Sequence, residues 1–218
     1  MGMHFGIVAA RTQVAQLMDA FAGAWPHHQP RSRVTLAGLS AMGDWMRATQ
    51  RQAAATDAGS LDVFGFWQDG QWALMLDPSY AQASDRRALA TLSERFGLVL
   101  SFVVETSARC AFFEAFDGGR LVRRIQAIDG ELQSDGQRLP QEAGLPEDRY
   151  DADETRQLQR AFGIAGIEGV PSDVSVVGAA YLDRTDYGTP QRRRTPLPPA
   201  PSPSDPPRRA WWRFWTIH

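Results

Sequence analysis

The chain has 218 residues, of which 43% are hydrophobic and 22% are charged. These values are close to those of an average globular protein, so the composition excludes global disorder. The longest apolar runs, such as residues 98–104, are far shorter than the roughly 20 residues that a spanning helix needs. Residues 1–183 hold 16 Arg against 23 Asp and Glu, or −7, whereas residues 184–218 hold 7 Arg against 2 Asp, or +5. An acidic body predicts that nucleic acid is not a partner, because phosphate contacts need basic residues.

Cysteine content and the N-terminal sequence bear on the cellular compartment. Cys110 is the only cysteine, which excludes a disulfide within the chain. The first eleven residues lack the basic start and long apolar stretch of a secretory signal, and they indicate a first strand instead. We therefore expect a cytoplasmic protein. All 23 basic residues are arginine, which is typical of a GC-rich bacterial genome.

The first half of the chain predicts two strand–helix units followed by a hairpin. After the first strand, Thr12 is a candidate cap for a helix that Pro26 ends. A strand over residues 33–39 leads to Ser40, a second candidate cap, and to a helix that runs to about Ala54. Two apolar runs then flank Asp69-Gly70, the sequence signal for a tight hairpin turn between two strands.

The second half predicts a helix over residues 84–96, ended by Gly97, and then three strands in succession. These strands are expected at residues 98–105, 111–116 and 120–128. Their short connections make them antiparallel. Asp151, with Glu154 three residues later, forms a capping-box pattern for a further helix, and residues 174–182 indicate a late strand.

Together these elements predict one α+β domain over residues 1–183. We expect a mixed or mainly antiparallel sheet with three to four helices packed on it, followed by a disordered proline-rich tail. The two strand–helix units and the later strands belong either to one sheet or to two.

Catalytic and metal-binding motifs are weak in this sequence. Cys110 is surrounded by no family-type cysteine signature, so we expect a mostly buried, unreactive thiol. Adjacent imidazoles rarely bind one ion, so we place His27 and His28 on a loop. Asp151 and its acidic neighbours lack the glycine and terminal glutamate of a calcium loop. We therefore predict no metal site, no cofactor and no catalytic residue.

Acidic residues on and after the predicted strands allow two interpretations. Glu105 and Glu114 lie on neighbouring strands, and paired carboxylates perform acid–base catalysis in some enzymes. With Glu131 and Asp135 they equally suit a solvated acidic surface for a basic protein partner. An enzyme with an unrecognised carboxylate site therefore stays an alternative.

Two tryptophans, Trp67 and Trp72, flank the predicted Asp69-Gly70 turn. In an antiparallel hairpin they can face each other, and such an aromatic pair adds roughly 0.5 to 1 kcal/mol to sheet stability. The sequence favours this structural use. An exposed pair on a partner surface is the alternative.

The C-terminal tail is the most unusual feature of the sequence. Residues 184–207 form a Pro/Arg-rich linker, since eight of the 18 residues from Pro190 to Pro207 are proline. Residues 208–218 follow as a separable docking segment, in which we assign the docking role to Arg208, Arg209, Trp211, Trp212, Arg213, Phe214 and Trp215. Arginine interleaved with tryptophan suits an anionic membrane surface or an acidic groove on a protein.

Several stretches resemble uncharacterised small bacterial α+β proteins of the polymorphic-toxin immunity type. They are Trp67-Gln-Asp-Gly-Gln-Trp72, Ser93-Glu-Arg-Phe-Gly97, Gly119-Arg-Leu-Val-Arg123 and Leu139-Pro-Gln-Glu-Ala-Gly-Leu145. The resemblance implies a cytoplasmic, non-catalytic binding protein and transfers no site residues. The leading hypothesis is thus a protein that neutralises a basic toxin. The alternative is a peripheral membrane protein or adaptor, located at the inner face of the membrane through its tail.

Overall fold

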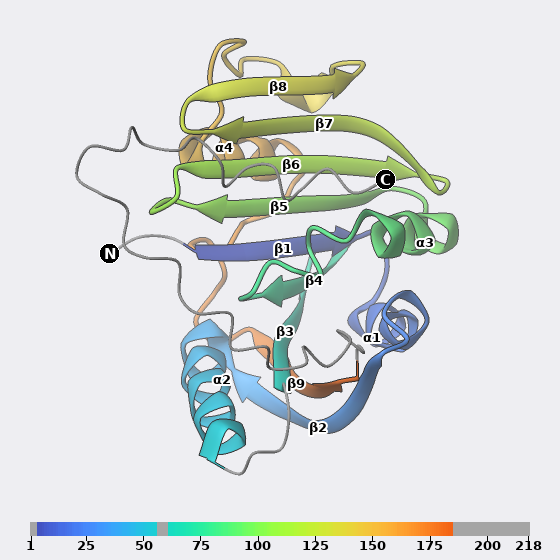
Figure 1. Ribbon diagram of the computed structural model, residues 1–218, viewed down its shortest axis with the longest axis vertical. Helices are drawn as coiled ribbons and strands as arrows, with labels where there is room; N and C mark the ends of the chain where they lie inside the picture. The colour runs from blue at the N-terminus through green and yellow to red at the C-terminus, as the bar shows by residue number, and fades with distance from the viewer. Residues whose placement is uncertain (1–3, 56–60, 185–218) are drawn as a thin grey trace, which may run out of the picture. The chain divides into compact units, whose positions relative to one another are not determined.

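The computed structural model describes residues 4–55 and 61–184. Within these residues a single antiparallel sheet contains nine strands in the order β2-β9-β3-β4-β1-β5-β6-β7-β8 (Figure 1). The strands are β1 (His4–Ala10), β2 (His28–Ala37), β3 (Leu61–Asp69), β4 (Trp72–Asp77), β5 (Val99–Glu105), β6 (Cys110–Asp117), β7 (Arg120–Ile128), β8 (Glu131–Gly136) and β9 (Ser175–Asp183). The strand–helix units and the later strands therefore share one sheet.

Helices cover both faces of this sheet. Those described are α1 (Val14–Ala24), α2 (Gly38–Ala55), α3 (Arg86–Phe96) and α4 (Ala152–Ala161), with a short 3-10 helix η1 (Pro140–Glu142). α1 and α3 pack on one face, whereas α2 and α4 pack on the other. The predicted α+β class, with a mainly antiparallel sheet and three to four helices, is confirmed.

Alternation along the strands divides the core into two layers. Ile7 faces the layer beneath α2 and α4, and its neighbour Val8 faces the layer beneath α1 and α3. In the same way Phe102 contributes to the first layer and Val103 to the second. Both faces of the central strands are buried, which explains their continuous apolar sequences.

The order of the strands in the sheet differs from their order along the chain, with β1 between β4 and β5 and β9 between β2 and β3. β9, the last strand, lies between β2 and β3 and pairs with both. It therefore ties the C-terminal end of the described chain to two N-terminal strands. The prediction of a late strand is confirmed, whereas β8, which follows the Asp129-Gly130 turn, was missed.

Three local predictions are corrected by the structure. α1 begins after Gln13, and Thr12 instead donates a hydrogen bond to the side chain of a residue in the first turn. Ser40 lies inside α2, because the helix already begins at Gly38. The third helix begins later than predicted, after Asp85, whose carboxylate accepts two backbone N–H groups of the first turn.

The hairpin turn between β3 and β4 is shifted by one residue from the predicted Asp69-Gly70. Asp69 pairs with Trp72, so the two loop residues are Gly70 and Gln71. Only Gly70 of these has a positive φ, 55°, which a residue without a side chain adopts at little cost.

The C-terminal predictions fall largely outside the described residues. The chain divides into two units between Thr185 and Asp186. Of the predicted linker only Arg184 is described, and the docking segment 208–218 lies entirely outside the described residues. Within the described residues, no helix has the length and hydropathy needed to cross a bilayer.

Candidate functional site

Strand register places four predicted partner-surface carboxylates on the same face of the sheet. Glu105 on β5 lies opposite Cys110, which lies opposite Ile128, which in turn lies opposite Glu131. A second row joins Glu114, Arg124 and Asp135 on β6, β7 and β8. Directly opposed residues lie on the same face of a sheet. The two rows are four positions apart on β6, and an even spacing along a strand also keeps side chains on one face. We call this surface the carboxylate face: Glu105, Cys110, Phe112, Glu114, Arg124, Gln126, Ile128, Glu131, Gln133 and Asp135.

Among residues 4–55 and 61–184, no helix lies over most of the carboxylate face. α4 lies on the far side of β5–β7, while on the near side of β6–β8 only α3 approaches, at one end (Figure 1). In the middle row, Phe112 and Gln126 are half-buried, which leaves part of each side chain accessible. As far as the described residues go, the face is a sheet surface that helices leave largely uncovered. Its middle row holds Phe112 and Gln126, and the carboxylates lie in the rows on either side.

The four carboxylates differ in their availability to a partner. Glu114 is only 10% exposed and accepts a hydrogen bond from Arg86 at 2.7 Å. Burial raises the pKa of Glu114, and Arg86 opposes that effect. Glu105 is held by His4. Glu131 is exposed, and Asp135 keeps 60% of its side chain exposed although it pairs with Arg124.

Glu105 and Glu114 are too far apart for paired acid–base catalysis. Glu114 lies opposite Ser101, four residues along β5 from Glu105. Four residues of a strand span about 13 Å. Paired catalytic carboxylates of glycosidases lie about 5 to 9.5 Å apart. The geometry does not favour the enzyme alternative built on this pair.

Trp67 and Trp72 are buried and do not contribute to a partner surface. They lie diagonally on one face, because Trp67 is opposite Leu74 and Trp72 is opposite Asp69. The Trp72 indole N–H donates to the carbonyl oxygen of Phe162 at 2.9 Å. The predicted structural use of the two indoles is confirmed, although they are not directly opposed.

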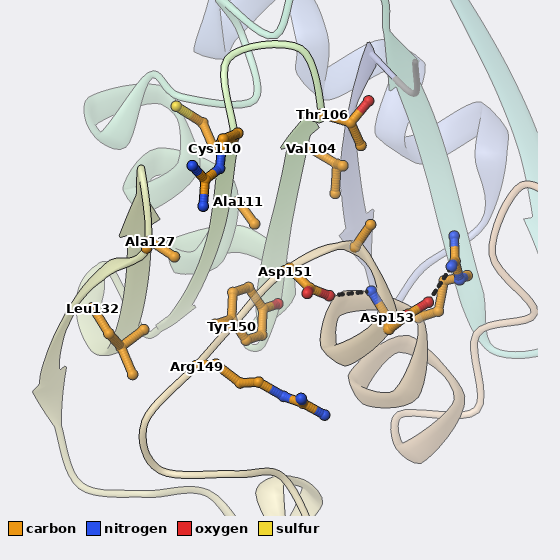
Figure 2. Close-up of a pocket in the computed structure, with 14 residues that line it drawn as sticks. Val104, Thr106, Cys110, Ala111, Ala127, Leu132, Arg149, Tyr150, Asp151 and Asp153 are labelled. Atoms are coloured by element: carbon orange, nitrogen blue, oxygen red, sulfur yellow. Dashed lines mark hydrogen bonds and ion pairs between the residues drawn. The ribbon is translucent and has the colours of Figure 1, made fainter. Parts of the chain in front are cut away.

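A cavity of about 390 Å³ lies on the opposite side of the sheet, between β5–β8 and the start of α4 (Figure 2). Its apolar walls come from Val104, Ala111, Ala127 and Leu132, and the Tyr150 ring lies across it. None of the predicted site residues that the structure describes lines this cavity. Its residues come from distant segments, so no sequence motif could have indicated it.

The charged side chains of α4 and of the segment just before it are engaged with one another around the cavity. Arg149 pairs with Glu154 at 3.0 Å, and Arg156 pairs with Asp153. Asp151 caps α4 by accepting the Asp153 N–H, which confirms the predicted capping box. Burial raises the pKa of Glu154, and the hydrogen bond with Asp151 raises it further. Burial opposes ionisation of Asp151, but hydrogen bonds from Glu154 and the Asp153 N–H outweigh this and lower its pKa. The cavity therefore suits a small apolar group more than an ion.

Cys110 is half-buried beside this cavity, and its sulfur points away from it (Figure 2). Burial raises the pKa of its thiol, and the negative charge of Asp129 raises it further. His4 belongs to the same cross-strand row, but Glu105 lies between the two residues. A thiol with a raised pKa is a poor nucleophile. The residue is half-buried, whereas the sequence predicted a mostly buried thiol.

His28 is not on a loop, contrary to the prediction. It is the first residue of β2 and is buried, whereas the neighbouring His27 is exposed. His27 lies in the turn before β2 and His28 lies in the strand, which separates the two imidazoles.

The chain matches no protein-family model, no curated protein and no solved structure. Its function therefore has to be inferred from the geometry of the chain itself.

Proposed function

We propose that this chain is a non-catalytic, cytoplasmic binding protein whose carboxylate face docks a protein partner rich in basic side chains. The observation that carries the proposal is the placement of Glu105, Glu114, Glu131 and Asp135, which come from three strands, on one face that the helices of the described chain leave largely open.

The chemistry of the face resembles that of a protein-binding surface. Phe112 in the middle row and Ile128 in the row of Glu105 and Glu131 supply apolar area, and the exposed carboxylates Glu131 and Asp135 lie on the edge strand β8. Interfaces commonly combine an apolar centre with a polar rim. The net charge of −7 over residues 1–183 would also steer a basic partner toward this body.

Neutralisation of a basic toxin is the particular binding function that we favour. An immunity protein of this kind acts by covering its partner, so it needs surface complementarity and no catalytic group. Attachment to a membrane through residues 208–218 stays an alternative prediction from the sequence. It fails if deleting residues 208–218 leaves binding to anionic vesicles unchanged.

The test is copurification from the source organism with wild-type protein and a charge-reversed variant. Glu131→Lys with Asp135→Lys changes two exposed side chains of the carboxylate face. Asp44→Lys with Glu147→Lys is the matched control, because it changes the net charge equally at exposed positions outside that face. The recovered partner is identified by mass spectrometry, and its affinity for each variant is measured by calorimetry.

We expect wild type and the control to retain a basic partner that the face variant binds at least tenfold more weakly. Recovery of no basic protein with wild type would refute the binding function. Equal binding by both variants would exclude the carboxylate face. If the partner is a toxin, coexpression with wild type should restore growth of cells that produce it.

A further inference from the structure

A polar cluster lies at one end of the sheet, remote in sequence and register from the carboxylate face. His28 begins β2, directly opposite Asp183 at the end of β9. Asp62, near the start of β3, lies opposite Tyr181, two residues before Asp183 on β9. Because β9 separates β2 from β3, the side chains of His28 and Asp62 converge over the end of β9 from its two sides. These three side chains therefore meet only in the folded sheet.

Donor atoms of the three side chains lie close enough together for one ion. One donor from each of His28, Asp62 and Asp183 lies within 4.8 Å of the other two. His28 Nε2 and Asp62 Oδ2 are 2.9 Å apart. Ligands about 2.1 Å from an octahedral metal ion lie about 3 Å from each other. The first two donors already have this separation, and a side-chain rotation at the strand end brings in the third.

Hydrogen bonding leaves the buried imidazole poorly satisfied. His28 Nε2 lies 2.9 Å from the Asp62 carboxylate and 3.3 Å from the Gln82 amide nitrogen. A protonated Nε2 satisfies the carboxylate but opposes the amide N–H, whereas an unprotonated Nε2 does the reverse. Nδ1 of the same ring has no hydrogen-bond partner among the described residues, although His28 is only 7% exposed. A cation between Nε2 and the carboxylates takes the place of the proton that Nε2 otherwise needs toward Asp62, and the Gln82 amide then has to turn its N–H groups away from the ring.

Charge and packing around the cluster also suit a divalent ion. Asp62 and Asp183 supply two carboxylates beside the imidazole, and mixed nitrogen and oxygen donors of this kind suit a divalent transition-metal ion. The ring of Phe21 lies edge-on to the His28 ring at 5.6 Å, and the rings of Phe64 and Tyr181 lie within 6.4 Å. This apolar shell fixes the imidazole and lowers the local dielectric, which strengthens metal binding.

We propose that His28, Asp62 and Asp183 bind a divalent transition-metal ion. One imidazole with two carboxylates suits Zn²⁺, Co²⁺ or Mn²⁺, whereas Mg²⁺ and Ca²⁺ prefer sites composed of oxygen ligands. The ion joins the ends of β2, β3 and β9. Asp62 is partly exposed at the cluster, so water completes the coordination shell.

The test uses the untagged full-length chain, stripped with a chelator, and Zn²⁺, Co²⁺ or Mg²⁺ as the probe. Isothermal titration measures stoichiometry and affinity, and visible absorption of bound Co²⁺ reports its ligand geometry. Asp62→Asn and Asp183→Asn keep side-chain size while they weaken the ligands. His27→Gln and Asp44→Asn are the matched controls, because these exposed residues have the same chemistry outside the cluster.

We expect one Zn²⁺ per chain, at least tenfold weaker binding by both cluster variants, and unchanged binding by both controls. Mg²⁺ should not compete with Zn²⁺ for this site. Absence of saturable Zn²⁺ and Co²⁺ binding at about 0.1 mM metal, which is about a hundred times a Kd of about 1 μM, overturns the proposal. Binding that is lost in His27→Gln and retained in the cluster variants overturns it as well.

A measurement on wild type alone covers the case in which a cluster variant fails to fold. Substoichiometric Mn²⁺ broadens the amide resonances of residues near its binding site. The proposal requires the strongest broadening around residues 28, 62 and 183. Broadening centred elsewhere overturns it.

Discussion

The ion pair between Arg123 and Glu142 gives the sharpest test of how the edge of the sheet is held. Arg123 on β7 is 9% exposed and Glu142 in η1 is 2% exposed. Two parallel hydrogen bonds of 2.9 and 2.8 Å join the guanidinium to the carboxylate. The same guanidinium donates to the carbonyl oxygens of Asp135 and Gly136 at the end of β8. One side chain thus fixes β7, β8 and η1 together.

Glu142→Gln removes the charge and preserves the shape of the side chain. Arg123 then stays charged at any accessible pH and loses the carboxylate that pairs with it among the described residues, although the two carbonyl groups still accept from it. Removing one partner of a buried ion pair typically lowers the unfolding free energy by about 3 to 5 kcal/mol. Domains of this size have unfolding free energies of about 5 to 15 kcal/mol, so this loss is a large fraction.

The double substitution Arg123→Met with Glu142→Leu provides the comparison. It removes both charges and replaces them with apolar side chains of similar volume, which is often neutral or stabilising. We therefore expect the double variant to be more stable than Glu142→Gln by at least about 2 kcal/mol.

Urea unfolding followed by tryptophan fluorescence measures these differences, since Trp67 and Trp72 are buried in the core. A cost below about 1 kcal/mol for Glu142→Gln would show that the pair is solvated or relaxes. In that case the Arg123–Glu142 pair does not hold the β7–β8 edge, and the reasoning is refuted.

Three further changes probe the packing of the sheet. Trp72→Phe removes the indole hydrogen bond to Phe162 and leaves a buried carbonyl without this partner, so we expect a loss of about 2 to 4 kcal/mol in thermal or urea unfolding. Asp77→Asn replaces a fully buried carboxylate that accepts three backbone N–H groups and a serine hydroxyl, so it should cost about 2 to 4 kcal/mol at pH 7. Burial raises the pKa of Asp77 above 3.8, so the folded protein binds this proton more tightly than the unfolded chain. The unfolding free energy of wild type should therefore fall in part as pH rises from about 4. Asp77→Asn should lack this part of the fall. An identical dependence of unfolding free energy on pH in the two proteins would contradict the assignment to Asp77. Gly65→Ala would place a Cβ 1.7 Å from Met42 Sδ, so repacking of α2 should cost about 1 to 3 kcal/mol, and a neutral result would mean that α2 does not pack closely on β3 at this point.

The predictable parts of the fold depend on contacts close in sequence. The β3–β4 hairpin, the β5–β7 meander and the Asp151 cap each follow from a turn or capping signal within a few residues. The errors have local causes as well. Thr12 was expected to cap α1, but its hydroxyl donates to the Gln16 side chain and Gln13 is the capping residue. β8 was missed because its exposed, polar sequence has no apolar alternation.

The candidate sites were less predictable. The carboxylates Glu105, Glu114, Glu131 and Asp135 were identified as acidic residues of strands and turns, but their shared face depends on the register of three ladders. A shift of one residue in any ladder would turn part of the set to the other face. The cavity at α4 was not anticipated for the same reason, because its walls also come from several strands whose register the sequence does not reveal.

The sequence by itself determined the α+β class, the antiparallel hairpins, the acidic charge of residues 1–183 and the absence of an intrachain disulfide. These properties follow from composition and from signals that act over a few residues. Tertiary structure alone decided that β9 lies between β2 and β3, and this insertion brings His28, Asp62 and Asp183 together. The physical reason is that strand pairing between distant segments is chosen by the burial of whole faces, which no local pattern in the sequence encodes.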